Sequence, residues 1–184
     1  MGAVLLASGC ITPQKEQAEA SAASAALTGA VKAIDADLAG VQALNLASAN
    51  RLSRTGLVGP AAETALREKL DALPWALSSV TISPEGIIVA AVPEHYREIV
   101  GRDVKYQGPV QEALAMKVPR VSEVFMMEEG FAGISQSAPV FSSNGTYLGY
   151  TDVTYRPETL IERAIGPVVE GTPFDIWVTQ TDGT

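Results

Sequence analysis

The sequence has 184 residues, of which 47% are hydrophobic and 18% are charged, and its formal net charge at pH 7 is −8. This composition supplies enough apolar side chains for a packed core and excludes a chain that is disordered throughout. Its basic residues are scattered, whereas nucleic-acid binding requires clustered Lys and Arg, so no nucleic-acid partner is expected. No apolar stretch reaches the roughly 20 residues that a membrane-spanning helix needs.

One cysteine and one histidine restrict the available chemistry. A zinc site built from Cys and His needs about three or four such ligands, so neither a metal nor a cofactor is expected. The sequence contains no glycine-rich phosphate loop, no Gly-x-Ser-x-Gly elbow and no His-Glu-x-x-His helix. No residues therefore suggest an enzyme, and we expect a protein without catalytic activity.

The N-terminal ten residues form a short apolar run that ends in small residues and a cysteine. Residues 6–10, Leu-Ala-Ser-Gly-Cys, resemble the lipobox of a bacterial or archaeal lipoprotein, whose cysteine is lipidated. The charged start of a secretory signal is missing, so residues 1–10 are interpreted as a truncated signal with Cys10 as the lipidation site. The alternative is an apolar tail with an incidental cysteine.

The following segment, from Pro13 to about Leu52, contains no further proline and is dominated by alanine, which has the highest helix propensity. We predict one long helix there. Its spacing of apolar residues is typical of a narrow packing seam on one neighbouring helix or sheet, or on a second copy in a homodimer. The seam residues are Leu27, Val31, Ile34, Leu38 and Val41.

Shorter elements follow, marked by alternating apolar residues and by Pro, Gly and Asn at the turns. The strongest hairpin signal is Asn144-Gly145, because both residues tolerate positive φ. Glu128 and Glu129 are expected to form a solvated turn. In chain order, we predict a helix at 60–73, a hairpin of strands 79–83 and 87–92, an irregular excursion at 93–119 with a short helix at 109–116, strands at 121–127, 130–141 and 147–155, a helix at 157–165 and a strand at 174–180.

This order of elements resembles an extracellular PAS-like sensor, and several segments resemble a Cache domain more closely. Residues 79–92 resemble the opening Cache hairpin, and residues 99–104 (Ile-Val-Gly-Arg-Asp-Val) resemble the family's "iiGkdls" segment. Residues 138–141 (Ala-Pro-Val-Phe), with the turn and the strand start at 144–149, resemble "aPvfd.nG..lGv". Residues 174–183 resemble the start of the second repeat of a double Cache domain.

The resemblance implies an α+β fold in which the long N-terminal helix packs on a PAS-like antiparallel sheet. Residues 11–156 would be the helix and the membrane-distal Cache module. Residues 157–184 would be a connecting helix and the first strand of a second, membrane-proximal module, which we expect to be cut because the chain stops at a turn signal, 181–184.

The resemblance also implies an extracytoplasmic sensor that binds a small polar metabolite, held at a membrane by a lipid on Cys10 or by an upstream helix. In this family the ligand lies against the sheet, under the excursion. The matching positions are Tyr96, Arg97, Arg102 and Tyr106 in the excursion and Ser122, Phe125, Ser135, Ser137 and Asp152 on the sheet.

The charged side chains among these residues indicate which charged groups a ligand could carry. An arginine such as Arg102 suits a carboxylate, and a buried Asp152 would suit an ammonium group. Amino-acid-binding members carry an Arg-x-Trp-Tyr cluster in the excursion; here Tyr106-Gln107 stands near the aromatic position without a tryptophan. The ligand class therefore stays open.

The alternative is a ligand-free structural module of a surface lipoprotein that dimerises through the long helix. A pocket filled with large apolar side chains would favour this alternative. A hollow pocket lined by Arg102, Tyr106 and Asp152 would favour the sensor.

Overall fold

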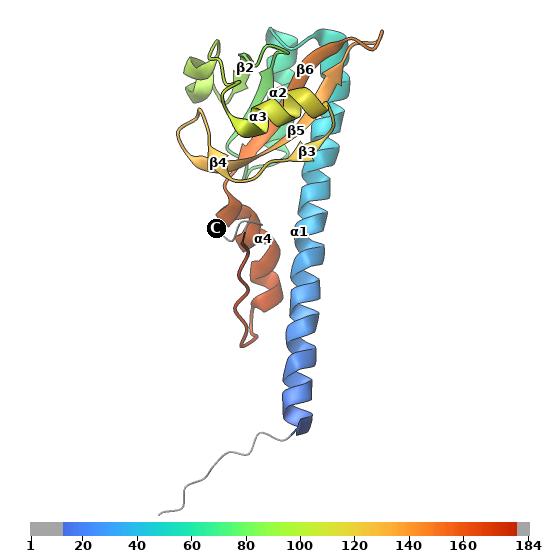
Figure 1. The fold of residues 1–184 in the computed structure, drawn as a ribbon, viewed down its shortest axis with the longest axis vertical. Coiled ribbons are helices and arrows are strands. Elements are labelled where there is room, and N and C mark those ends of the chain that lie inside the picture. The colour runs from blue at the N-terminus through green and yellow to red at the C-terminus, as the bar shows by residue number, and fades with distance from the viewer. Residues whose placement is uncertain (1–12, 180–184) are drawn as a thin grey trace, which may run out of the picture.

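Residues 13–179 are described here from a computed structural model of the chain. The predicted signal at 1–10 with Cys10 and the predicted turn at 181–184 lie outside the described residues. In the described part, one long helix stands beside a small antiparallel sheet (Figure 1). This arrangement confirms the predicted α+β combination.

The long helix α1 runs from Pro13 to Thr55, over 43 residues. It ends where Gly56 adopts a left-handed backbone conformation, φ 82°, and donates its N–H to the Leu52 carbonyl. The shorter helix α2, Pro60–Asp71, follows after a tight turn. Both predicted helices are confirmed. Within residues 13–179, no helix combines the length and the apolar character needed to cross a bilayer.

Six short strands form an antiparallel sheet in the spatial order β2-β1-β6-β5-β3, with β4 also paired to β5. The predicted hairpins β1–β2 and β5–β6 are confirmed, the second closing around Gly145 with φ 83°. The strands are β1 Ser78–Ile82, β2 Ile88–Val92, β3 Arg120–Val121, β4 Phe125–Met126, β5 Ala132–Phe141 and β6 Tyr147–Tyr155.

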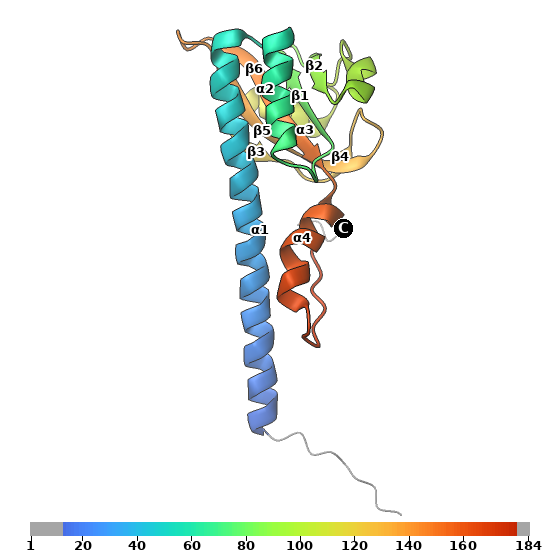
Figure 2. The same ribbon diagram turned by 180° about the vertical axis from the view of Figure 1, so that it is seen from behind.

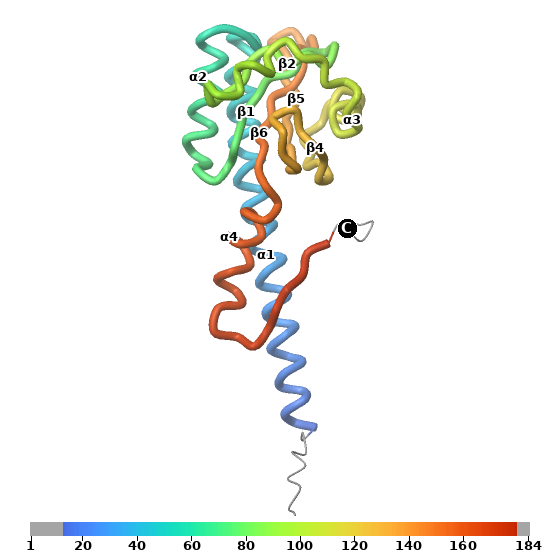
Figure 3. The backbone as a smooth tube through the Cα atoms, turned by 90° about the vertical axis from the view of Figure 1, so that its left-hand side faces the viewer, coloured from blue at the N-terminus to red at the C-terminus, as the bar shows by residue number. Residues whose placement is uncertain are grey.

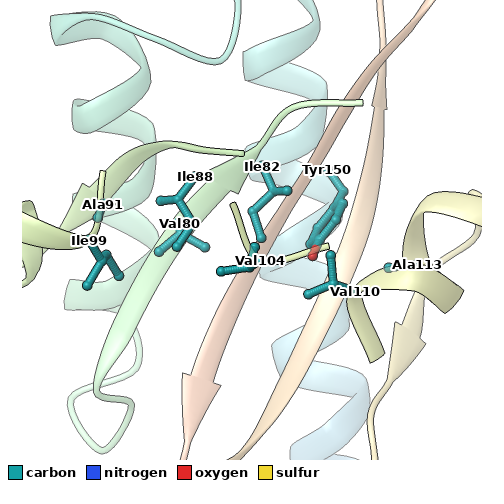
Figure 4. Close-up of a cluster of buried hydrophobic side chains, with 9 residues drawn as sticks. All are labelled: Val80, Ile82, Ile88, Ala91, Ile99, Val104, Val110, Ala113 and Tyr150. Atoms are coloured by element: carbon teal, nitrogen blue, oxygen red, sulfur yellow. The ribbon is translucent and has the colours of Figure 1, made fainter. Parts of the chain in front are cut away.

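The two faces of the sheet are covered differently. Helices α1 and α2 cover one face, here called the back face (Figure 2). The opposite, front face carries the short helix η1, Glu94–Ile99, and α3, Gly108–Met116 (Figure 1). An apolar cluster that includes Val80, Val110 and Tyr150 fills the space between α3 and the sheet (Figure 4). The front face is thus closed by short, irregular elements, and these can frame a pocket.

Below the sheet, helix α4, Pro157–Val169, packs beside α1 (Figure 1). The predicted seam of α1 is covered from Ile34 to Val41 by α4 and by the sheet. In contrast, Leu27 is 57% exposed and Val31 is 51% exposed. The seam therefore packs within the chain only over its C-terminal part.

One predicted strand, at 121–127, is divided into β3 and β4. The ladder stops because the side chain of Ser122 takes the place of a backbone acceptor: the Ser135 N–H donates to Ser122 Oγ at 2.9 Å. The Ser122 hydroxyl in turn donates to the Glu123 carbonyl at 2.7 Å. The Ser122 N–H still donates to the Ser135 carbonyl at 2.9 Å, but residues 122–124 do not continue the strand, and the prediction of one continuous strand is wrong.

The C-terminal part also differs from expectation. The predicted helix at 157–165 continues to Val169 and includes Pro167. The predicted strand at 174–180 is absent over its described part, 174–179, which runs back along α4 (Figure 3). A strand needs a neighbour for its backbone groups, and no described strand pairs with this segment.

Gly149 provides a test of the sheet's register. Its φ is 122°, and a Cβ there would lie 2.0 Å from the Ile82 carbonyl oxygen. We expect Gly149→Ala to lower the free energy of unfolding by about 1 to 3 kcal/mol more than Gly145→Ala, whose added Cβ meets nothing within 4 Å. Urea unfolding of both variants measures the difference. Equal losses would show that this close approach is absent.

Candidate ligand-binding site

A pocket lies on the front face of the sheet, between the strands, α3 and the turn that joins β4 to β5. Its polar lining includes Ser122, Ser135, Ser137 and Asp152, and its apolar walls include Phe125. These five are the predicted ligand-binding residues of the sheet, and the fold brings them together. The pocket leaves about 30 Å³ of free interior space, enough for one or two water molecules.

The strand register explains why these side chains converge. Arg120 of β3 pairs with Ser137 of β5, Ser137 pairs with Asp152 of β6, and Asp152 pairs with Val80 of β1. Directly opposed residues of antiparallel strands project to the same face. One row of side chains therefore crosses the pocket floor, with a cation at one end and a carboxylate in the middle.

Asp152 is the most unusual residue of this row, because it is an aspartate that is only 4% exposed. Its Oδ2 accepts a hydrogen bond of 2.8 Å from the Ser135 hydroxyl. Its Oδ1 is buried, and within residues 13–179 it has no hydrogen-bond partner. A buried carboxylate oxygen without a partner carries a large desolvation cost, which a bound cation or donor would offset.

The back face supplies a counter-charge for this carboxylate. Lys69 of α2 is 3% exposed, and its ammonium donates to Asn45 Oδ1 at 2.9 Å, Thr151 Oγ1 at 2.8 Å and the Asp152 carbonyl oxygen at 2.7 Å. All three ammonium hydrogens are thus used. Lys69 therefore lies behind the strand residue whose side chain faces the pocket.

The charges of Lys69 and Asp152 act on each other through the sheet. Burial raises the pKa of Asp152 to about 7, and the nearby Lys69 opposes that rise while Glu129 adds to it. The hydrogen bond from the Ser135 hydroxyl lowers the same pKa, and so does the nearby Val80 backbone, although its contact with the carboxylate does not have the geometry of a hydrogen bond. Burial likewise lowers the pKa of Lys69 to about 7, against the attraction of Asp152.

The same polar network reaches the long helix. Asn45 of α1 donates to the Gln136 carbonyl at 2.7 Å, and the Gln136 side chain donates to the Leu38 carbonyl of α1 at 2.8 Å. Gln136 lies between the pocket residues Ser135 and Ser137 on β5 and faces the opposite side. Hydrogen bonds therefore join α1 directly to β5, and they join it to β6 through the Lys69 ammonium, which binds both Asn45 and Thr151.

The four predicted residues of the excursion lie outside the pocket lining. Arg102 forms an ion pair of 2.5 Å with Glu128, and the Tyr106 hydroxyl donates to the same carboxylate at 2.8 Å. Arg102 holds the pKa of Glu128 below its usual value, assisted by Tyr106. Since Glu128 lines the pocket, these three residues, here called the clasp, join the excursion to the β4–β5 turn across its rim.

The other two excursion residues are farther from the site. Arg97 pairs with Glu94 of its own helix at 2.9 Å, and both side chains are exposed to solvent. Tyr96 is partly buried, packs against the front-face cluster and contacts the His95 ring at a centroid distance of 4.3 Å. The structure thus brings Arg102 and Tyr106 to the rim and leaves Arg97 on the surface.

Four charged residues of the site were not predicted, one of which is Glu128 of the clasp, where a solvated turn was expected. Arg120 lines the pocket with a buried Nε that has no partner within residues 13–179, while its terminal nitrogens contact Glu112 and Met116. Glu129 also lines the pocket, although a solvated turn was expected there. The burial of Lys69 could have been predicted from the sequence, because Lys69 follows Leu66 by three residues and so lies on the same, buried face of α2.

This arrangement can bind a ligand but has no residues that suggest catalysis. Within residues 13–179, no group of three or more His, Cys, Asp or Glu side chains could hold a metal ion. The pocket offers hydroxyl groups, an aromatic wall and an unsatisfied carboxylate on a mixed α+β scaffold. Fold and site together define a PAS-like sensor of the Cache type.

Comparison with known proteins gives the family. The family model described as "HK/GC/Chemotaxis protein-like, sensor domain" matches residues 29–157, and the chain belongs to this family. It is a sensor domain related to those of histidine kinases and chemoreceptors. No curated protein matches the sequence.

Solved structures with the same fold include an extracellular ligand-binding receptor from Desulfohalobium retbaense, with 30% identity and a TM-score of 0.76. The match covers 86% of this chain but 29% of that one, so this chain spans under a third of its relative. The ligand-binding domain of the Campylobacter jejuni chemoreceptor Tlp3 in complex with L-norvaline is 15% identical, with a TM-score of 0.70, and the match covers 94% of this chain and 72% of that one. The ligand-binding domain of the Pseudomonas aeruginosa amino-acid chemoreceptor PctC in complex with GABA is 23% identical, with a TM-score of 0.53. The match covers 76% of this chain and 65% of that one.

Removal of the Lys69 ammonium tests its structural role. Lys69→Met leaves three buried oxygen acceptors without their donor and Asp152 without its counter-charge, so we expect a loss of roughly 3 to 5 kcal/mol in the free energy of unfolding. The exposed helical Lys32→Met should change it by less than about 0.5 kcal/mol. In urea unfolding, Lys69→Met combined with Asp152→Asn should cost less than the sum of the single variants. Equal stability of the two lysine variants would contradict this role.

Proposed function

We propose that this sensor domain binds a small metabolite through an ammonium group that pairs with Asp152. The observation that carries the proposal is the buried Oδ1 of Asp152, a residue that lines the pocket; this oxygen has no hydrogen-bond partner in the described part of the chain. An ammonium is the natural partner, because it supplies both a charge and a hydrogen bond. Amines and amino acids are the ligand classes that carry one.

The remaining predicted sheet residues support this ligand chemistry. Ser135 already orients the Asp152 carboxylate, while Ser122 and Ser137 offer further hydroxyl groups at the pocket floor. Phe125 would pack on the aliphatic part of the ligand. The free Nε of Arg120 offers one donor to a ligand acceptor, which an amino acid would use with its carboxylate.

Ligand entry requires the pocket to widen, because its free interior is smaller than any metabolite. The clasp of Arg102, Tyr106 and Glu128 is the exposed connection across the rim, and its opening would let the excursion move away from the β4–β5 turn. Binding would then stabilise the widened state, with no chemical change of the ligand.

We further propose the membrane anchor, the second module and the dimer contact that the sequence predicts. The domain would work outside the cytoplasm, held by a lipid on Cys10 or by an upstream helix, with residues 157–184 leading into a second module. The exposed Leu27 and Val31 on α1 would provide a homodimer contact. Through that helix, a change at the pocket would reach an output domain or a partner protein.

One observation favours the alternative, a ligand-free dimerisation module. The pocket's free interior of about 30 Å³ is small for a binding site. The polar lining favours the sensor, because a structural core has no use for an unpaired buried carboxylate.

A thermal-shift screen of the domain with amines, amino acids, small carboxylates and purines tests the ligand class. A ligand at 100 times its dissociation constant adds about 2.7 kcal/mol, which corresponds to a rise of roughly 5 to 10 °C. Asp152→Asn should abolish the rise, whereas the exposed Asp71→Asn should leave it unchanged. If no ammonium compound shifts the melting temperature and the domain forms a dimer that Val31→Glu disrupts, the ligand-free alternative is correct.

The pH dependence of binding follows from Asp152. Its pKa is raised to about 7, and only the ionised carboxylate pairs with an ammonium. Affinity should therefore fall about tenfold per pH unit below pH 7. Isothermal titration calorimetry at about pH 8 and pH 5.5 should show binding more than tenfold weaker at the lower pH. An affinity independent of pH would exclude Asp152 as the cation's partner.

A further inference from the structure

A second carboxylate lines the same pocket and is held in the same manner as Asp152. Glu129, in the turn between β4 and β5, accepts a hydrogen bond of 2.5 Å from the Ser78 hydroxyl through its Oε1. Ser78 also shares a hydrogen bond of 2.5 Å with Thr154. Both hydroxyl groups are buried, so the Glu129 carboxylate is drawn toward the pocket floor and away from solvent.

The register gives the separation of the two carboxylates. Thr154 of β6 pairs with Ser135 on one side and with Ser78 on the other. Ser135 holds Asp152 and Ser78 holds Glu129, and these serines stand two strand spacings apart, about 10 Å between their Cα atoms. The carboxylates that they hold are therefore on the order of 5 to 10 Å apart. One ammonium with two hydrogen bonds of about 2.8 Å spans at most about 5.6 Å, so over most of this range each carboxylate needs an ammonium of its own.

The other charged side chains at the pocket are already paired. Arg120 forms an ion pair with Glu112, and Glu128 is held by Arg102. Within residues 13–179, no basic side chain forms an ion pair with Asp152 or Glu129. Lys69 neutralises Asp152 only from behind the sheet, with its hydrogens bound to three other oxygens. The described residues therefore leave the pocket with one uncompensated negative charge, on Glu129, and with one unpartnered carboxylate oxygen, on Asp152.

The walls between these points are apolar and close together. Phe125, Met127 and Tyr150 line the pocket beside the two carboxylates. These apolar side chains would contact the aliphatic part of a ligand whose charged groups reach the two carboxylates.

We propose that the ligand is a linear aliphatic diamine, with one ammonium on Asp152 and the other on Glu129. This inference rests on the proposed function and specifies its ligand. It favours a diamine over an α-amino acid, because the second charged group of the pocket is a carboxylate. Arg120, the one arginine among the described lining residues, has only its Nε free, whereas its terminal nitrogens contact Glu112 and Met116.

Three ligands with the same four-carbon chain separate the possibilities: 1,4-diaminobutane, butylamine and 4-aminobutanoate. By isothermal titration calorimetry at about pH 8, the diamine should bind at least tenfold more tightly than either of the others. Glu129→Gln, which keeps an oxygen acceptor for Ser78, should reduce diamine affinity to the level of butylamine and leave butylamine binding unchanged. The exposed Glu123→Gln, on the neighbouring segment outside the pocket, should change neither affinity.

A series of diamines with longer and shorter chains gives a second measurement that needs no variant. Affinity should pass through a maximum at one chain length, because two fixed carboxylates accept only one spacing. Equal binding of butylamine and the diamine, with no effect of Glu129→Gln, would overturn the diamine inference and leave the role of Asp152 intact. Tightest binding of 4-aminobutanoate would overturn it in favour of an amino acid. Absence of binding by all three, and by every other ammonium compound, would refute the proposed function itself.

Discussion

The buried ammonium of Lys69 is the constraint on which the rest of the structure depends. It contacts oxygen atoms from α1 and from β6 while its own backbone belongs to α2, so one side chain fixes two helices against the sheet. A buried lysine is tolerated only when it is fully paired, and here each hydrogen has an acceptor. Because one acceptor is the carbonyl of Asp152, the same contact also sets the position and the electrostatic surroundings of the pocket carboxylate.

The two faces of the sheet therefore differ in how firmly they are held. The back face is a continuous set of hydrogen bonds, in which Gln136 connects β5 to α1 directly and Lys69 connects β6 to Asn45 of α1. The front face is closed by short elements and by the exposed clasp, which can open at little cost because surface ion pairs contribute little stability. A ligand on the front face would therefore act on strands that are rigidly connected to the long helix, the arrangement expected of a sensor.

The residues that determine the fold differ from the residues that determine the ligand. Chemoreceptor domains with about 15% identity share this fold over most of the chain. A long helix behind an antiparallel sheet can be built from many sequences, since it needs only a suitable pattern of apolar residues and turns. Ligand choice depends instead on a few polar side chains at the pocket floor. In this chain the proposed ones are the carboxylates of Asp152 and Glu129, beside an arginine whose terminal nitrogens are already engaged.

The sequence by itself determined the elements whose causes are local. Alanine content predicts α1, the Asn144-Gly145 turn predicts the β5–β6 hairpin, and the apolar context of Asp152 marks a candidate binding residue. The tertiary structure alone decided the partners of the charged groups. Lys69 and the Asp152 carbonyl are 83 positions apart, and Arg102 and Glu128 are 26 apart, so no local pattern distinguishes them from solvated charges. The prediction of a strand at 174–180 was wrong over residues 174–179 for a related reason. A strand forms only where another segment supplies hydrogen-bond partners, and a local sequence pattern does not show whether such a segment is present.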